Sequence, residues 1–259
     1  MKKLLIAVFL LSIVFSGIAQ KKDSKTTKEP VAKKVPAPKP DWSKYDFSSR
    51  ANDHFMIQYG YDGWTGTNDT TSPSGFSRHF NFYVMLDKVF KTDPHFSVGY
   101  GLGIGSTNIF FKDRYVDVKA LSTRLPFNDV SQSDQNRFKK FKLVTTFLEL
   151  PIELRYVKDP INPGKGFKAS IGVKLGYLLS AYTKAKNQID KNGKTIYGSN
   201  YIRKESDRNF FNATRVAFTG RIGFGFLSLD GSYQVTGILR SGTGPVINPY
   251  SIGLTLSGL

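Results

Sequence analysis

Residues 96–105 read FSVGYGLGIG, and they decide the fold class because large apolar residues alternate strictly with small ones. The large side chains from Phe96 to Ile104 fall on one face of an extended chain, and Ser97 with four glycines falls on the other. A period of two residues indicates a β-strand, since successive side chains of a strand point to opposite faces. The sequence therefore predicts a strand with one bulky apolar face and one very small face.

The same alternation recurs along the rest of the chain. It is clear over 147–156, 167–180 and 215–226, and weaker over 54–64, 78–89, 229–239 and 249–257. With 96–105, these segments make eight strands, an even number. Several of them exceed the roughly 9–11 residues that a tilted strand needs to cross a bilayer. We therefore expect an all-β fold.

The connections between these segments alternate in length. Long or intermediate connections are expected over 65–77, 106–140, 184–212 and 240–248, and short ones over 90–94, 158–166 and 227–228. Outer-membrane barrels show this pattern, because their extracellular loops are long and their periplasmic turns are short.

The N-terminal segment has the order of residues of a secretory signal peptide. Lys2 and Lys3 precede an apolar stretch from Leu4 to Phe15, and small residues follow up to Gln20. We expect residues 1–20 to be a cleaved signal peptide. Residues 21–50 are rich in lysine and proline without apolar periodicity, which predicts a disordered periplasmic linker. Residues 51–259 then form the barrel.

Charged residues decide between a soluble β-sandwich and a barrel in lipid. Both alternate, but a sandwich turns its charged face to water, whereas a membrane barrel encloses it. The apolar face of the segments carries no charge and many aromatic residues. Together with the export signal, this favours an eight-stranded antiparallel transmembrane up-and-down β-barrel, and a soluble periplasmic β protein is the alternative.

Residues 147–156, FLELPIELRY, resemble the YLEIPL…Y strand of the PorT-like family, outer-membrane β-barrel proteins common in Bacteroidota. Residues 167–177, 230–234 and 250–259 are similar to the same family. The resemblance implies an eight-stranded outer-membrane barrel and brings no catalytic motif with it. The chain departs from the usual outer-membrane signature because it ends in Leu259 rather than in an aromatic residue.

The enclosed face predicts a lumen filled by charged side chains. Eight strands leave an interior just wide enough for side chains to fill. We expect Glu149, Lys174 and Arg221 to form a buried ionic cluster at mid-barrel, since buried charges must be paired. The glycine face of 96–105 would leave space for their long side chains. The other charged residues on this face are Glu153, Arg155, Lys168 and Arg215, and the first three of these are further candidate members of the lumen cluster. A structural plug is the main interpretation, and a gated proton or ion path is the alternative.

The two longest loops are basic. Residues 107–140 hold seven Lys and Arg against four acids, and residues 184–212 hold seven against three. Such loops predict contacts with lipopolysaccharide phosphates, although solvated loop charges explain them equally well. The candidate contact residues are Lys112, Arg114, Lys139, Lys140, Arg203, Lys204 and Arg208. We also expect Phe110, Phe111, Phe210 and Phe211, at the bases of these loops, to anchor at the membrane interface.

Composition excludes several classes of function. The chain has 259 residues and a mean hydropathy of −0.28, which is incompatible with a bundle of membrane-spanning helices. It has no cysteine, and its three histidines lie in two groups expected a membrane thickness apart, so we expect no metal site and no cofactor. Ser77, His79 and Asp69 at the outer rim are a weak candidate set for a lipid hydrolase.

The expected function is therefore a non-enzymatic outer-membrane barrel with a structural, surface-binding or assembly role. The alternatives are a narrow channel and, less favoured, a lipid-modifying enzyme. The net charge of +17 suggests anionic partners. We expect these to be outer-membrane lipid and lipopolysaccharide, with the barrel assembly machinery and an unknown protein as further partners. Export argues against nucleic acid, and we expect a monomer.

Overall fold

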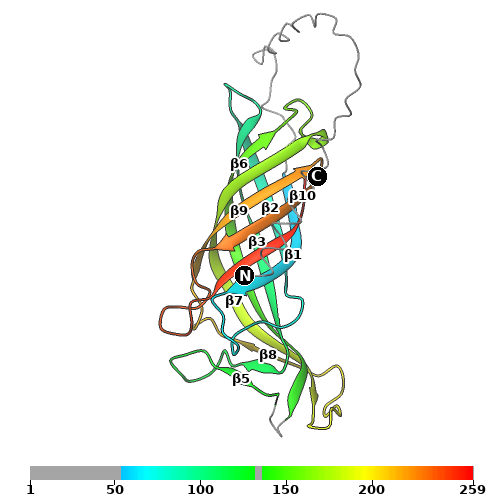
Figure 1. Cartoon of the computed structure of the whole chain (residues 1–259), viewed down its shortest axis with the longest axis vertical. Coiled ribbons are helices and arrows are strands. Elements are labelled where there is room, and N and C mark those ends of the chain that lie inside the picture. Colours follow the sequence, from blue (N-terminus) through cyan, green and yellow to red (C-terminus); the bar gives the residue numbers. More distant parts are fainter. Residues whose placement is uncertain (1–53, 132–135, 259) are drawn as a thin grey trace, which may run out of the picture. The chain divides into compact units, whose positions relative to one another are not determined.

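The computed structural model describes residues 54–131 and 136–258, and these form an antiparallel β-barrel (Figure 1). The predicted signal peptide, 1–20, and linker, 21–50, lie outside the described residues. No helix within the described ranges has the length and apolar character needed to span a membrane. The barrel strands are β1 (Phe55–Thr65), β2 (Arg78–Val89), β3 (Phe96–Phe111), β6 (Arg137–Val157), β7 (Phe167–Ile189), β9 (Thr214–Phe224), β10 (Leu227–Gln234) and β11 (Asn248–Ser257).

The sheet closes on itself. Its order is β6-β3-β2-β1-β11-β10-β9-β7-β8, and an additional pairing joins β6 to β7. Of these nine strands, β8 (Ile202–Ser206) pairs only with the outer part of β7, so eight strands close the barrel. Every pairing is antiparallel, and consecutive barrel strands are neighbours. The predicted fold class is confirmed.

The apolar faces of the strands form the outer surface of the barrel. Leu102, Ile104 and Phe218 are 52%, 51% and 58% exposed, whereas the inward-facing Glu149 is fully buried and Arg221 is 6% exposed. A protein in water would bury the first group and expose the second. The soluble-sandwich alternative is therefore wrong, and the outer surface suits the hydrocarbon of a bilayer.

Strands β6 and β7 extend well beyond the predicted segments, with 21 and 23 residues. The sequence placed residues 137–140 and 184–189 in loops, whereas the structure continues the two strands through them, past the ends of β9, β10 and β11 (Figure 1). The extension carries β8 on the edge of β7, and the hairpin β4 (Arg114–Val116) to β5 (Phe127–Asp129) forms a separate small sheet. We call this the long-loop end, and the end with connections 90–95, 158–166 and 225–226 the short-turn end.

A β-bulge in β7 changes which of its alternating residues face inward in the outer part of the strand. Thr146 pairs with Ser180 and Phe147 with Leu178, so Leu179 is the extra residue on β7. Leu178 and Ala181 are consequently both buried, although they lie three positions apart.

The long-loop end contains an apolar core. We call it the apolar cap cluster, and it joins loop residues to the outer parts of β3, β6 and β7. Phe111, Phe210 and Phe211 belong to it and are at most 5% exposed. The expectation that they anchor at the membrane interface is wrong, because the loops fold over the barrel mouth and take these rings inward. Its buried members are Trp64, Ile109, Phe111, Val116, Val118, Leu125, Phe141, Leu143, Phe147, Leu178, Ala181, Ala185, Phe210, Phe211, Ile238, Leu239 and Ile247.

Candidate functional site

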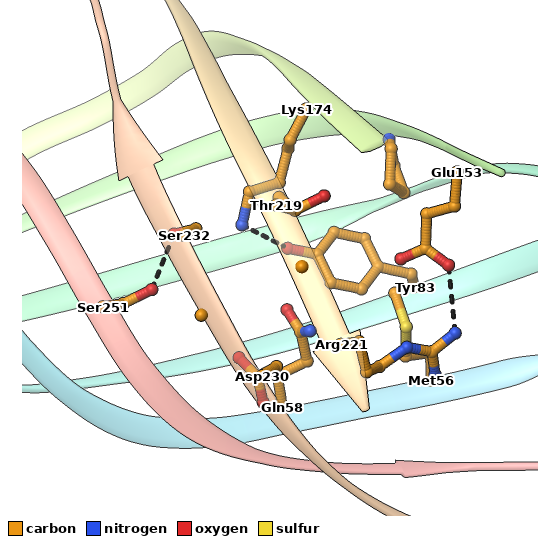
Figure 2. A pocket seen from close by; sticks show the side chains of 13 residues that line it. Met56, Gln58, Tyr83, Glu153, Lys174, Thr219, Arg221, Asp230, Ser232 and Ser251 are labelled. Carbon is orange, nitrogen blue, oxygen red and sulfur yellow. Dashed lines mark hydrogen bonds and ion pairs between the residues drawn. The ribbon is translucent and has the colours of Figure 1, made fainter. Parts of the chain in front are cut away.

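The first of two ionic clusters in the lumen surrounds Glu149 on β6. Its carboxylate forms ion pairs with Arg215 of β9 and with Lys174 of β7, whose Nζ lies 3.4 Å from Oε2, and it accepts a hydrogen bond from the Tyr83 hydroxyl. Lys174 Nζ also donates to that hydroxyl at 3.2 Å, as Figure 2 shows. We call these four residues the central cluster. Two cations against one carboxylate leave it with an excess of positive charge.

The glycine face of β3 makes room for these groups. A Cβ at Gly105 would overlap the Glu149 carboxylate, one at Gly103 would overlap the Tyr83 ring, and one at Gly99 would overlap the Arg155 guanidinium. The predicted use of this glycine face, space for long side chains from other strands, is therefore confirmed.

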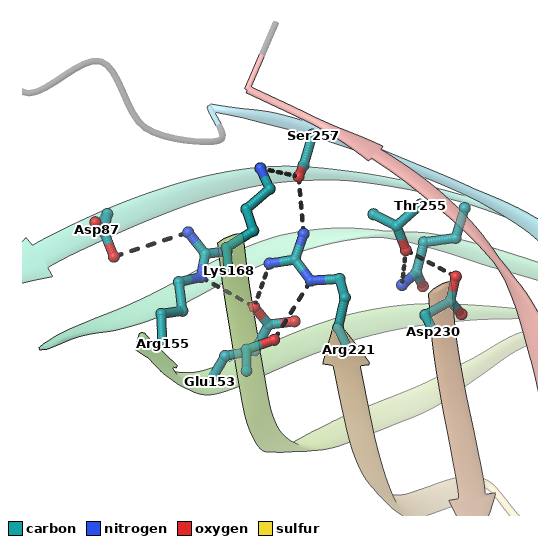
Figure 3. Close-up of polar contacts among 10 residues, drawn as sticks. Asp87, Glu153, Arg155, Lys168, Arg221, Asp230, Thr255 and Ser257 are labelled. Carbon is teal, nitrogen blue, oxygen red and sulfur yellow. Dashed lines mark hydrogen bonds and ion pairs between the residues drawn. The ribbon is translucent and has the colours of Figure 1, made fainter. Parts of the chain in front are cut away.

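The second cluster lies toward the short-turn end (Figure 3). Glu153 Oε2 is 2.9 Å from Arg155 Nε and 3.0 Å from Arg221 Nη2. The Arg155 guanidinium also lies 3.7 Å from Asp87. The hydroxyl of Ser257, on the last strand, accepts from Arg221 at 2.9 Å and from Lys168 at 3.1 Å. We call this group the turn-end cluster, and it links β2, β6, β7, β9 and β11.

All six predicted lumen residues are buried, but they divide between the two clusters. Arg221 contacts Glu153 and does not join Glu149 among the described contacts. The register explains the difference. Ser170 pairs with both Arg155 and Arg221, whereas Gly176 pairs with both Glu149 and Arg215. Arg215, which the sequence places on the inward face, therefore occupies the level assigned to Arg221.

Further polar residues, uncharged except for Asp230, complete the lumen and were missed from the sequence. Asn81 donates to Gln58 at 3.2 Å, Gln58 to Thr255 at 3.0 Å, and Thr255 to Asp230 at 2.8 Å. They occupy inward-facing positions of β1, β2, β10 and β11. Alternation along a strand indicates the face on which such a side chain lies, but not its partners. Figure 2 shows the cavity beside Gln58 and Asp230, which measures about 20 Å³. A second, of about 30 Å³, lies beside Asp62 and His79. Each has room for about one water molecule and for no larger solute.

The structure does not assemble the candidate hydrolase set. His79 is 3% exposed, and its Nδ1 lies 2.8 Å from Asp62 inside the lumen. The Ser77 hydroxyl accepts the Phe110 N–H at 3.1 Å, and Asp69 is exposed. No contact among the described residues joins the three. The described ranges also hold no group of three or more His, Cys, Asp or Glu placed to bind a metal ion.

The candidate lipopolysaccharide contacts all lie at the long-loop end. Lys112, Lys139 and Lys140 are exposed, and Arg114 is half-buried. The other three residues also hold the loops together. Lys204 lies 4.2 Å above the Tyr182 ring, Arg208 donates to the Leu178 carbonyl at 3.2 Å, and Arg203 pairs with Glu205 at 2.6 Å.

Glu205 links the β4–β5 hairpin to β8. It accepts a hydrogen bond from the Tyr115 hydroxyl while it pairs with Arg203. Burial, and then the hydrogen bond to Glu205, raises the pKa of the Tyr115 phenol above its ordinary value.

We predict that Tyr115 ionises at a higher pH than an exposed tyrosine. The raised folded-state pKa means that the contact stabilises the loops fully below the ordinary tyrosine pKa of about 10 and loses this effect only as the pH rises through the folded value. Spectrophotometric titration of wild type and Tyr115→Phe measures it. The difference between the two titration curves should correspond to the ionisation of one phenol, at a higher pH than that of the other tyrosines. A difference curve with its midpoint near pH 10 would contradict the prediction.

Comparison with known proteins agrees with this architecture at the level of the family. Residues 45–238 match the model of the family described as outer membrane protein beta-barrel domain. No curated protein matches the sequence.

Solved structures of outer-membrane proteins give more distant matches. Ail, the attachment invasion locus protein of Yersinia pestis, aligns with 79% of this chain and 97% of its own, at 12% identity and a TM-score of 0.33. Its complex with the heparin analogue sucrose octasulfate gives the same coverage, 11% identity and 0.31. A porin mutant of Rh. blastica covers 79% of this chain and 98% of its own, at 9% identity and 0.18. Such scores establish no common fold, so the architecture rests on the strand register and the family match.

Proposed function

Because the chain belongs to the outer membrane protein β-barrel domain family, we propose that this outer-membrane barrel is a non-enzymatic protein with a closed lumen that binds molecules at the cell surface. The observation that carries the proposal is the filling of the lumen. From the short-turn end to the long-loop end, the interior is filled in turn by the turn-end cluster, the central cluster and the apolar cap cluster. A solute would have to displace buried ion pairs and a packed apolar core.

The basic long-loop end supports the surface-binding part of this proposal. Seven candidate contact residues lie there, and Arg and Lys side chains are suited to phosphate groups. We propose lipopolysaccharide and an unidentified surface protein as partners, the barrel assembly machinery as the route of insertion, and a monomer as the working state. The stretch FLELPIELRY and the N-terminal segment support the finer proposals of a PorT-like protein of Bacteroidota exported through a signal peptide.

We predict that the purified protein forms no steady open channel in planar lipid bilayers. The cavities described in the lumen measure about 20 to 30 Å³ each, room for about one water molecule, so they offer no continuous ion path. Current recordings at both polarities measure this, with an open porin in the same bilayers as positive control. A steady conductance in every insertion would support the channel alternative and overturn the proposed function.

A further inference from the structure

A cavity of about 460 Å³ lies at the long-loop end, apart from both ionic clusters of the lumen. Residues of the β4–β5 hairpin, the start of β6, the outer end of β7 and β8 line this partly open cavity. Six of them are Arg114, Arg137, Arg203, Tyr115, Phe138 and Phe141. Its volume falls in the range of about 300–1,000 Å³ typical of small-molecule sites. The lumen cavities, in contrast, have room for only about one water molecule each.

The charge of this cavity favours an anionic ligand. Three arginines line it against one acid, Asp129. Arg203 is paired with Glu205, and Arg114 faces Asp129 across the β4–β5 hairpin. Arg137 is half-buried, and its side chain forms no ion pair with an acid of the described residues, although its backbone pairs with Ile189 in the sheet. A guanidinium that pairs with no acid of the described residues, beside two further arginines, suits an anion with several acceptor oxygens.

The uncharged lining favours a sugar as the body of that ligand. Tyr115 and Phe138 offer ring surfaces, and ring faces pack against the C–H faces of pyranoses. Asn128, Asn136 and Gln188 also line the cavity, and side-chain amides can both donate to and accept from hydroxyl groups. Rings, amides and guanidinium groups together match a carbohydrate that carries a charged substituent.

We propose that this cavity binds a phosphorylated sugar of about disaccharide size, with the phosphate at Arg137. The inference rests on the proposed surface-binding function and names the class of ligand. Two sources share this chemistry, the phosphorylated sugars of lipopolysaccharide and a soluble sugar phosphate. The binding experiment below distinguishes them by competition.

Isothermal titration calorimetry on the mature chain, folded in detergent micelles free of lipopolysaccharide, tests the proposal. The probes are trehalose 6-phosphate, trehalose and inorganic phosphate. We expect trehalose 6-phosphate to bind at least tenfold more tightly than either of the others, because it alone engages both Arg137 and the ring and amide wall. Equal affinity for trehalose and trehalose 6-phosphate would overturn the proposal.

A matched pair of variants separates local binding from general attraction. Arg137→Gln should lower the affinity for trehalose 6-phosphate at least tenfold. Lys191→Gln removes the same charge from an exposed position in the connection between β7 and β8, outside both the cavity and the candidate contact residues, and it should change the affinity less than twofold. Equal losses in both variants would reduce the effect to net charge and contradict the site. Heat-modifiable gel migration establishes that both variants are folded.

Competition identifies the source. Displacement of trehalose 6-phosphate by added lipopolysaccharide assigns the site to the surface lipid, and persistence of binding assigns it to a soluble sugar phosphate. The bilayer recordings report on the closed lumen independently. A failure of sugar binding with silent bilayers therefore removes this inference alone, whereas a steady conductance removes the proposed function.

Discussion

Replacing Glu149 with alanine is expected to lower the free energy of unfolding by about 3–5 kcal/mol, the usual effect of breaking a buried ion pair from one side. Glu149 is 0% exposed, and it is the acid of the central cluster that pairs with Arg215 and Lys174. Its removal leaves two cations facing each other in a closed lumen. It also takes the hydrogen-bond acceptor from Tyr83.

Unfolding in urea measures this effect, with the folded fraction at each urea concentration read from heat-modifiable gel migration. Asp69→Ala removes a carboxylate from an exposed loop position, and it should stay within about 0.5 kcal/mol of wild type. The double variant Glu149→Ala, Arg215→Met should recover part of the loss, because one of the two unpaired cations is gone. An unchanged stability of Glu149→Ala would contradict a buried central cluster.

The eight strands and their facing were predictable because alternation is a local property. The boundaries of β2 agree with the predicted segment 78–89, and the shared inward direction of Glu149, Glu153 and Arg155 follows from the even number of residues that separates them. The level of a residue along the barrel is different. This level depends on the strand register, and the register of each hairpin adds to that of the one before. The sequence therefore predicted Arg221 as a partner of Glu149, whereas the structure has Arg215 in that position.

The long-loop end was the least predictable part. Residues 137–146 mix lysines with apolar residues, and the bulge at Leu179 breaks the period of two, so neither extension shows a clear strand pattern. The apolar cap cluster joins residues as far apart as Trp64 and Ile247. Nothing in the neighbourhood of Phe211 indicates that its ring lies in that core rather than at the membrane interface. The 460 Å³ cavity depends on the same long-range contacts and was likewise missed.

Arginine in place of Phe218 is expected to destabilise the barrel in lipid vesicles by about 2–4 kcal/mol, the effect of a cation on the lipid face near the bilayer midplane. Phe218 is 58% exposed on the outer surface near the middle of β9, and the neighbouring strands place Val173 and Tyr233 beside it. Tyr197→Arg provides the control, because Tyr197 is 66% exposed in the long connection before β9.

Comparing Phe218→Arg with Tyr197→Arg tests whether the outer surface of the barrel contacts lipid or water. In water, a cation at either exposed aromatic position would change the free energy of unfolding by no more than about 0.5 kcal/mol. In lipid, only the cation on β9 must leave water, so only Phe218→Arg should refold poorly into vesicles while Tyr197→Arg refolds like wild type. Equal refolding of both variants would mean that the apolar faces of the strands do not contact hydrocarbon, and the enclosed charges would then need another explanation.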